Sequence, residues 1–408
     1  MNPHLLLVTG KDPLEDTSGH GSYGRMWARA AVAAGYWPEI FSVSYHEGGA
    51  NVAYGHVHRK RSPWRWLCPY RRTGIPTYAA GWHTGILARA IVNRARQLDP
   101  SVPVILHGIQ LWTAAAARAA RRLRAEGREV RLFMSAYTTI EHEFNERWRG
   151  SRELPGAAPT LSMFWEMANL HLFLNRCERL ACREADRIVV HYESVRRLVE
   201  AAWSPCAPVM CLPYTTEQAM ISPAEPGHSE NGEPMVLAVS RHDSRKGLDT
   251  LLRALALLNE QGVGFRACLV GAGSLLPVHR RMAAELGLGH KVEITGYVED
   301  TTPYWRAASV FVLPSHQEGS GAMSLLEALE RGKAIVASGI DGIPEDIEDG
   351  RSGLLVPAKN PEALAAALRR VLENENLRRE LERSARARFE EKFAPNRLVS
   401  AIRSLYSP

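Results

Sequence analysis

The 408-residue sequence contains no apolar run near the roughly 20 residues that a membrane-spanning helix needs. Its first residues, MNPHLLLVTGKDP, have neither a positively charged stretch nor a small-residue cleavage site, so they predict a strand rather than a secretory signal. Proline and glycine, at 24 and 32 residues, are too few for a fibrous or disordered chain. We therefore expect a cytoplasmic globular protein.

Cysteine is scarce, with six residues in the chain. Two close pairs, Cys177 with Cys182 and Cys206 with Cys211, raise the question of a zinc site. The first pair falls in a strongly helical stretch, where its spacing does not place two side chains on one helix face. We expect free buried thiols in a reducing compartment and no metal site.

Charge of one sign is only slightly in excess, since 50 Lys and Arg against 44 Asp and Glu give a net charge of +6. This balance suits acidic partners such as phosphates, lipid headgroups or nucleic acid, and selects none of them. The apolar content of 45% is ordinary for a globular chain, and the length predicts two or three domains.

Strands and helices alternate along the chain, which predicts an α/β fold with parallel sheets. A polar linker with three prolines, 222–234, separates two such series. Two doubly wound domains would place their carboxyl strand ends along a cleft, where such sheets bind ligands. The expected strands are 4–10, 39–44, 102–107, 130–135, 187–191, 209–212, 235–240, 265–271, 291–295, 309–314 and 334–338. The main expected helices are 23–34, 111–127, 247–262, 322–332 and most of 361–406.

The segment from Gly19 to Gly24 matches the G-x-G-x-x-G pattern of dinucleotide-binding proteins. The first glycine lies well beyond the strand, and the second strand ends without an acidic residue, so nicotinamide or flavin binding is not expected. Two interpretations stay open: a glycine loop that caps a helix, or a loop whose amides face a phosphate across a cleft, which we favour.

Two cations, Arg241 and Lys246, follow the strand 235–240 and precede a helix. Cations at the carboxyl end of a strand, together with a helix dipole, form a site for an anion. The alternative is a solvated basic turn.

A third candidate site follows the strand 309–314, which delivers Glu318 to the same edge. The amides of Ser320, Gly321 and Ala322 would open the next helix and face an anion. A carboxylate beside such a site suits sugar hydroxyls, which donate to it. Glu327 lies further along that helix and belongs to the same candidate site. The alternative is that Glu327 is only an exposed glutamate of the helix. Together these sites indicate a nucleotide diphosphate with an attached sugar.

From Val236 to about Phe393 the sequence resembles the donor-binding half of GT-B glycosyltransferases, specifically glycosyltransferase family four of the group 1 type. The first half matches more loosely, through its glycine loop, His107-Gly108 and the strand 185–191. The matching pieces of the second half are R-x4-K-G at 241–247, V-G-x-G at 270–273, T-G-Y-V at 295–298, Glu318-Gly319, Leu326-Glu327-Ala328 and GIPEDIEDGRSGLLVP at 342–357.

The resemblance implies an α/β protein of two Rossmann-like domains facing a cleft. The N-terminal acceptor-side domain would span 1–214 and the nucleotide-sugar donor domain 215–388, with a C-terminal helix in 389–408 crossing back onto the first domain. It further implies an enzyme, a retaining hexosyltransferase that moves a sugar from a UDP- or GDP-sugar to an acceptor hydroxyl in cell-surface polysaccharide or glycolipid synthesis. Two alternatives stay open: an inactive sugar-nucleotide-binding regulatory subunit, or a transferase acting on a soluble natural product.

The resemblance also implies roles for individual residues. Arg241 and Lys246 would bind the donor diphosphate, Glu318 would contact the sugar, and Glu327 would bind the ribose hydroxyls. The other implied positions are His107 near the reacting sugar, Gly21 approaching the diphosphate from the first domain, Tyr297 and Val298 at the base, and Gly271, Gly319, Ser320 and Gly321 lining the donor.

Two features depart from the family pattern. Eight residues instead of seven separate Glu318 from Glu327, so either the intervening loop bulges or Glu318 is displaced. Tyr214 stands where the family usually has an asparagine. The chain also has no D-x-D pair, so we expect no metal cofactor, with Arg241, Lys246 and helix N-termini neutralising the leaving diphosphate.

The acceptor side is indicated mainly by the segment 58–72, which holds six Lys or Arg, two Trp and one Tyr, and no acidic residue. Interleaved cations and aromatic side chains suit an anionic membrane surface, so a lipid-linked acceptor and a peripheral position on the cytoplasmic face are expected. The alternative is a solvated basic loop. No nucleic-acid partner is expected, because no helix-turn-helix or RNA-binding signature accompanies the segment. An inserted helix pair in 141–182 would shape an acceptor pocket or simply pack.

Overall fold

The computed structural model describes residues 2–16, 19–44, 46–62, 80–142, 144–145, 164, 167–222, 224 and 233–407. These residues form two compact units. The first unit draws on the chain up to residue 144, on 160–221 and on 395–408, and the second mainly on 222–394.

The first unit is built on an eight-stranded sheet with the order β3-β4-β2-β1-β5-β6-β7-β8. All neighbouring strands are parallel except β3 and β4, which form an antiparallel hairpin. The strands are β1 (His4–Lys11), β2 (Glu39–Ser44), β3 (Gly48–Val52), β4 (Gly55–Arg61), β5 (Val104–Ile109), β6 (Val130–Ser135), β7 (Arg187–Val190) and β8 (Val209–Cys211).

Helices cover both faces of this sheet. On one face α3 packs against α2 and α6, and its run of buried alanines lets the helix axes come close. On the other, α1 packs against α8 and α16. The helices are α1 (Gly19–Ala33), α2 (Ala80–Ala95), α3 (Thr113–Ala125), α6 (Asn175–Glu184), α7 (Glu193–Trp203), α8 (Glu217–Ile221) and α16 (Pro395–Tyr406), with short turns at Gln110–Trp112 and Leu170–Leu174.

The second unit has a six-stranded sheet, all parallel, with the order β11-β10-β9-β12-β13-β14. Counted within the unit, this is the doubly wound order 3-2-1-4-5-6, whose direction reverses between β9 and β12. Ligands of such sheets bind at the carboxyl ends of the strands beside this reversal. The strands are β9 (Met235–Val239), β10 (Arg266–Val270), β11 (Val292–Gly296), β12 (Val310–Leu313), β13 (Ala334–Ser338) and β14 (Leu354–Val356).

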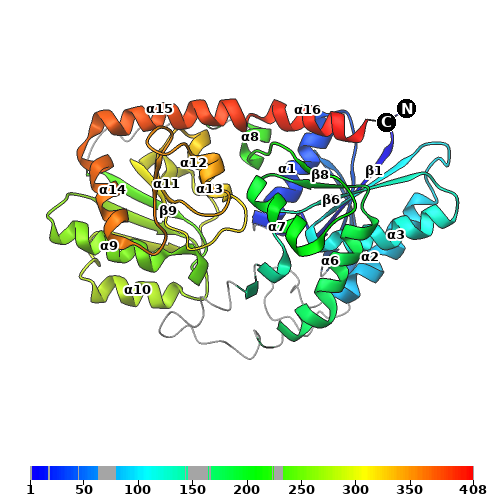
Figure 1. Cartoon of the computed structure of the whole chain (residues 1–408), viewed down its shortest axis with the longest axis horizontal. Coiled ribbons are helices and arrows are strands. Elements are labelled where there is room, and N and C mark those ends of the chain that lie inside the picture. The colour runs from blue at the N-terminus through cyan, green and yellow to red at the C-terminus, as the bar shows by residue number, and fades with distance from the viewer. Residues whose placement is uncertain are drawn as a thin grey trace. The chain divides into compact units, whose positions relative to one another are not determined.

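The central strands of the second sheet are uninterrupted apolar runs because helices cover both of their faces. On one side α9 packs against α10 and α14, and on the other α12 packs against α15 (Figure 1). The helices are α9 (Leu248–Glu260), α10 (Leu276–Glu285), α11 (Thr302–Ala307), α12 (Met323–Glu330), α13 (Ile343–Asp346), α14 (Pro361–Glu373) and α15 (Glu375–Lys392).

The structure confirms the predicted α/β fold class of two parallel-sheet domains, and three predicted strands, β2, β6 and β13, have the predicted bounds. The final helix α16 belongs to the first unit, where Trp27 donates a 2.8 Å hydrogen bond to the Tyr406 hydroxyl. The division into units falls after Ile221 and again before Pro395, a few residues beyond the borders expected from the sequence.

The structure corrects the loop expected at Gly19–Gly24, because these residues form the first turns of α1. A side-chain carbon at Gly21 would lie 2.1 Å from the backbone oxygen of Asp16, so the helix is packed directly on the preceding chain at this point. The hairpin β3–β4 and the short strand β14 were not predicted. The parts of 141–182 that are described contain α6 and the turn before it.

Candidate active site

The turn from β9 to α9 is held in a compact shape by its own polar groups. The Asp243 carboxylate accepts a 3.1 Å hydrogen bond from the Arg245 amide and so caps a short helical turn. Gly247 has a φ of 62°, and a side-chain carbon there would lie 2.0 Å from the Pro314 oxygen. The turn can therefore lie against the end of β12 only because this residue is glycine.

The ion pair between Lys246 and Glu318 lies where these two chain segments meet. The distance from Lys246 Nζ to Glu318 Oε2 is 2.5 Å, and the side chains are only 14% and 4% exposed. The other carboxylate oxygen of Glu318 accepts a hydrogen bond from the buried Ser315 hydroxyl. Two residues that the sequence singled out separately are thus in direct contact at the reversal of the strand order.

Arg241 precedes this pair and is the most accessible cation of the turn, with 62% of its side chain exposed. Its guanidinium lies 3.3 Å from the Asp243 carboxylate. Burial alone would raise the pKa of Asp243, but Arg241, Arg245 and Lys246 outweigh it and hold that pKa below its usual value. The turn therefore carries a surplus of positive charge at the carboxyl end of β9.

The loop 319–322 leads from Glu318 into α12. Gly319 has a φ of 79°, and the amides of Glu318 and Gly319 donate to Asp341 Oδ2 at 2.7 and 2.8 Å. Glu318 contacts Lys246, and α12 begins at Met323, so the residues between Glu318 and Glu327 consist of this loop and the first turn of α12.

Glu327 lies on α12 and is half-buried rather than exposed. Burial raises its pKa to about 7, and Arg331 only partly opposes that effect. Its carboxyl group therefore changes protonation state near neutral pH.

The neighbouring strands β10 and β11 bring two more predicted positions to the same edge. Gly271 has a φ of 145°, and a side-chain carbon there would lie 1.9 Å from the Ser240 oxygen, so the end of β10 closely approaches the end of β9. Tyr297 follows β11 directly and is 57% exposed. The predicted residues of the second unit thus lie on loops at one edge of one sheet, except Glu327, which lies within α12.

His107, the histidine expected near the reacting sugar, is fully buried in β5. Its Nδ1 atom lies 2.5 Å from the Tyr406 hydroxyl, and its Nε2 atom lies 2.8 Å from the Ser135 hydroxyl. Burial lowers its pKa to about 3. Both ring nitrogens have internal partners, so this arrangement gives His107 a place in the core and does not support contact with a substrate.

Gly21 is buried in α1, and its predicted approach to a diphosphate stays a prediction. Sequence reasoning missed Ser315 and Asp341. Their signal is weak, since a serine after a strand and an aspartate before a short helix are both common in turns.

The basic segment 58–72 falls partly outside the described residues, which end at residue 62 and resume at residue 80. In the described part, acidic residues from elsewhere offset the cations. His58 lies 2.7 Å from Glu39, Arg59 lies 3.9 Å from both Asp12 and Glu15, and Lys60 lies 3.5 Å from Glu47. The sequence of 58–72 alone therefore overestimates the positive charge of the segment, because acidic residues from other segments lie close to its described cations.

Two further expectations can be compared with the structure. Cys177, Cys182 and Cys268 are buried thiols as predicted, whereas Cys206 and Cys211 are exposed, which corrects the prediction for that pair. Within the described ranges, no helix is both long and apolar enough to cross a bilayer.

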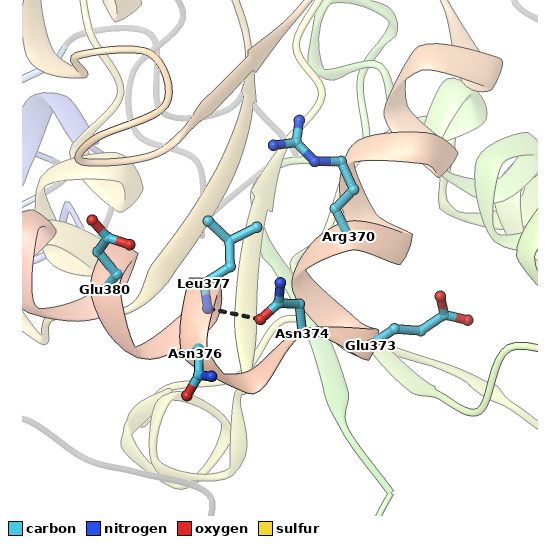
Figure 2. A pocket seen from close by; sticks show the side chains of 6 residues that line it. All are labelled: Arg370, Glu373, Asn374, Asn376, Leu377 and Glu380. Atoms are coloured by element: carbon cyan, nitrogen blue, oxygen red, sulfur yellow. Dashed lines mark hydrogen bonds between the residues drawn. The ribbon is translucent and has the colours of Figure 1, made fainter.

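A cavity of about 520 Å³ lies at the junction of α14 and α15, away from the loops just described. Figure 2 shows its lining, in which the Asn374 side chain accepts a hydrogen bond from the Leu377 amide and caps α15. The lining residues are Arg370, Glu373, Asn374, Asn376, Leu377 and Glu380. None of them belongs to a strand-end loop, and we assign this cavity no role.

Comparison with known proteins identifies relatives of the second unit. Residues 224–388 match the family described as glycosyl transferases group 1. A GDP-mannose-dependent alpha-(1-6)-phosphatidylinositol monomannoside mannosyltransferase of Mycolicibacterium smegmatis is 28% identical over 200 residues, which cover 45% of this chain and 52% of that protein. The chain spans about half the length of the curated relatives it matches.

Solved structures match over the whole chain. Sucrose-phosphate synthase of Thermosynechococcus elongatus has a TM-score of 0.72 at 21% identity and covers 100% of this chain and 98% of its own. HepE of Anabaena, solved with UDP and glucose, has a TM-score of 0.69 at 17% identity and covers 100% of both chains. The second unit therefore belongs to the group 1 glycosyl transferases, and the fold is that of the GT-B glycosyltransferases, as the motifs predicted.

Proposed function

We propose that this protein is a retaining, metal-independent glycosyltransferase that moves a hexose-type sugar from a UDP- or GDP-sugar to an acceptor hydroxyl. The observation that carries the proposal is the contact between Lys246 and Glu318 at the strand-order reversal of the second sheet. A cation for a diphosphate and a carboxylate for sugar hydroxyls are thereby placed side by side where such sheets bind nucleotides.

The proposed chemistry breaks the bond between the sugar and the diphosphate and forms one from the same sugar carbon to the acceptor oxygen. Lys246 and Arg241, with the amides at the start of α12, neutralise the charge that develops on the leaving diphosphate. The departing phosphate takes the acceptor proton, in keeping with front-face attack. Glu318 accepts hydrogen bonds from the sugar hydroxyls, and Glu327 accepts them from the ribose.

We place the acceptor in cell-surface polysaccharide or glycolipid synthesis. Support comes from the mycobacterial relative, whose name states a phosphatidylinositol mannoside acceptor and GDP-mannose as the donor. HepE, which was solved with UDP and glucose, supports a UDP-sugar donor to the same degree. The proposal therefore includes both UDP-sugars and GDP-sugars. A lipid-linked acceptor would require the protein to reach the cytoplasmic face of a membrane.

A panel of UDP- and GDP-sugars tests the proposal without knowledge of the acceptor. We expect slow hydrolysis of at least one donor by the wild-type protein, and loss of this hydrolysis in Lys246→Ala. Tight binding of a sugar nucleotide without any turnover would instead support a regulatory subunit. Absence of both binding and turnover across the panel would contradict the proposed function.

A further inference from the structure

Asp341 stands out among the residues around the Lys246–Glu318 pair because its backbone is left-handed. It lies between β13 and α13 with a φ of 47°, in a left-handed region that residues with side chains adopt rarely and that Asp and Asn tolerate best. Such strain persists only where surrounding contacts maintain it, and it is concentrated at functional sites. Asp341 is half-buried, and it lies beside the candidate site.

The contacts that maintain this conformation are the two backbone hydrogen bonds to one carboxylate oxygen. Asp341 Oδ2 accepts from the Glu318 amide at 2.7 Å and from the Gly319 amide at 2.8 Å. Hydrogen bonds from amides to a carboxylate are charge-assisted and stronger than those between neutral groups. They join the loop after β13 to the loop after β12, two neighbouring strands of the sheet.

Glu318 is thereby held from three neighbouring strand ends at once. Lys246, after β9, contacts one oxygen of its carboxylate, and Ser315, after β12, donates to the other. Asp341, after β13, holds its backbone amide. The first two contacts orient the carboxylate. Asp341 holds the main chain at Glu318 and Gly319, directly after the two amides, of His316 and Gln317, that donate to the Arg245 oxygen.

We propose that Asp341 is a positioning residue of the donor site, whose carboxylate holds the Glu318–Gly319 main chain so that the Glu318 carboxylate stays directed at the sugar. This inference rests on the proposed function and deepens it, because Asp341 acts through Glu318 and contacts no substrate itself. The anchoring bears most on the transfer step, since loss of alignment by a fraction of an ångström reduces catalysis more than binding.

Two substitutions separate the carboxylate from the backbone conformation. Asp341→Gly removes the carboxylate but suits a positive φ, so it removes the anchor while relieving strain. Asp341→Asn keeps an acceptor oxygen at the same place, and asparagine tolerates the left-handed region. Ser204→Gly is a matched control, because Ser204 also has a positive φ, of 44°, and lies at the end of α7 far from these loops in sequence.

The kinetic test compares kcat for donor turnover with the affinity for UDP or GDP alone. Asp341→Gly should lower kcat by about ten- to a hundred-fold and change nucleotide affinity by less than about threefold, because the nucleotide does not depend on Glu318. Asp341→Asn should restore most of kcat, and Ser204→Gly should match the wild type. An unchanged kcat in Asp341→Gly, or a parallel loss of nucleotide affinity and kcat, would overturn the proposal.

Amide hydrogen exchange tests the same anchor without requiring turnover. Peptides that contain Glu318 and Gly319 should exchange faster in Asp341→Gly than in the wild type, and Asp341→Asn and Ser204→Gly should not show this change. Equal exchange in Asp341→Gly and wild type would remove the physical basis of the proposal. If wild type turns over no donor while the exchange difference is present, the proposed function fails and the anchoring contact stands.

Discussion

At the carboxyl edge of the second sheet, Lys246 and Glu318 form an ion pair whose side chains are 14% and 4% exposed. Near the same edge of the first sheet, His107 and His191 are neutral and buried, with pKa values lowered by burial to about 3 and about 4. Both ring nitrogens of His107 and both of His191 have internal partners. The edge of the second sheet carries the largely exposed Arg241 beside this ion pair, whereas the histidines of the first sheet are paired within the core.

The partners supplied by the C-terminal helix explain this difference. The Tyr406 hydroxyl lies in contact with both Trp27 Nε1 and His107 Nδ1, so α16 completes a hydrogen-bond network inside the first unit. At the second edge, by contrast, Arg241 and Tyr297 are largely exposed. Similar strand topology therefore carries largely exposed Arg241 and Tyr297 side chains in the second unit and buried, internally hydrogen-bonded histidines in the first.

The largest effect is expected at the carboxyl edge of the second sheet. Lys246→Ala should lower donor turnover by about 10²–10³-fold, because a cation facing the leaving diphosphate is lost. It should also lower the free energy of unfolding by about 3 kcal/mol, because the buried Glu318 carboxylate loses its counter-charge. Initial rates and urea unfolding measure the two effects.

The double variant Lys246→Ala/Glu318→Gln separates these causes. Removing the unpaired charge should recover most of the stability and none of the turnover. A double variant that regained turnover would show that Lys246 serves only to neutralise Glu318.

In the first unit, Tyr406→Phe should reduce the free energy of unfolding and leave nucleotide affinity unchanged. The substitution deprives Trp27 and His107 of their shared partner, at a cost of about 1–3 kcal/mol in the free energy of unfolding. The matched control is Tyr304→Phe, at a half-buried tyrosine on α11. This substitution should change the free energy of unfolding by less than about 0.5 kcal/mol. If Tyr406→Phe lost nucleotide affinity while its folding stayed intact, this would contradict the claim that Tyr406 and His107 serve only the core of the first unit.

Much of the second edge was predictable because each charged residue follows a buried apolar strand. Arg241, Lys246 and Glu318 could be placed from that pattern alone. Asp341 could not, because it meets Glu318 across 23 residues of sequence through the pairing of β12 with β13. The partner of His107 could not be predicted either, because Tyr406 is 299 residues away and comes from the other end of the chain. The role of His107 near the reacting sugar is implied by the resemblance alone.

Local signals also misled at one point in the fold. Glycines at 19, 21 and 24 resemble a loop, yet they lie in the first turns of α1, and at Gly21 the helix packs on the preceding chain so closely that only glycine fits. The hairpin β3–β4 escaped prediction because its first strand, GGANV, has few of the apolar or β-branched residues that indicate strands.

A smaller effect concerns pH. Glu327 accepts ribose hydroxyls best when ionised, and its pKa is raised to about 7. Donor affinity should therefore rise by about tenfold from pH 6 to pH 8. Glu327→Gln should bind the donor with little dependence on pH. Calorimetric titration with the donor nucleotide at several pH values measures this, and a flat profile for the wild type would contradict the role of Glu327.

The smallest effect is expected for membrane contact. We predict binding to anionic but not to neutral liposomes, lost at high salt as screening shortens to about 3 Å at 1 M. Replacing Arg65, Arg71 and Arg72 by serine should weaken binding more than replacing Arg59 and Lys60, which lie close to acidic residues. Absence of binding to anionic liposomes at low salt would make a soluble acceptor the better hypothesis.

The central claim, that the donor binds at the carboxyl edge of the second sheet, is tested most directly by a crystal structure with UDP or GDP. The account predicts the diphosphate beside Lys246 and Arg241, the base near Tyr297 and the ribose at Glu327. A nucleotide bound elsewhere, for example in the cavity between α14 and α15, with Lys246 still paired to Glu318, would contradict it.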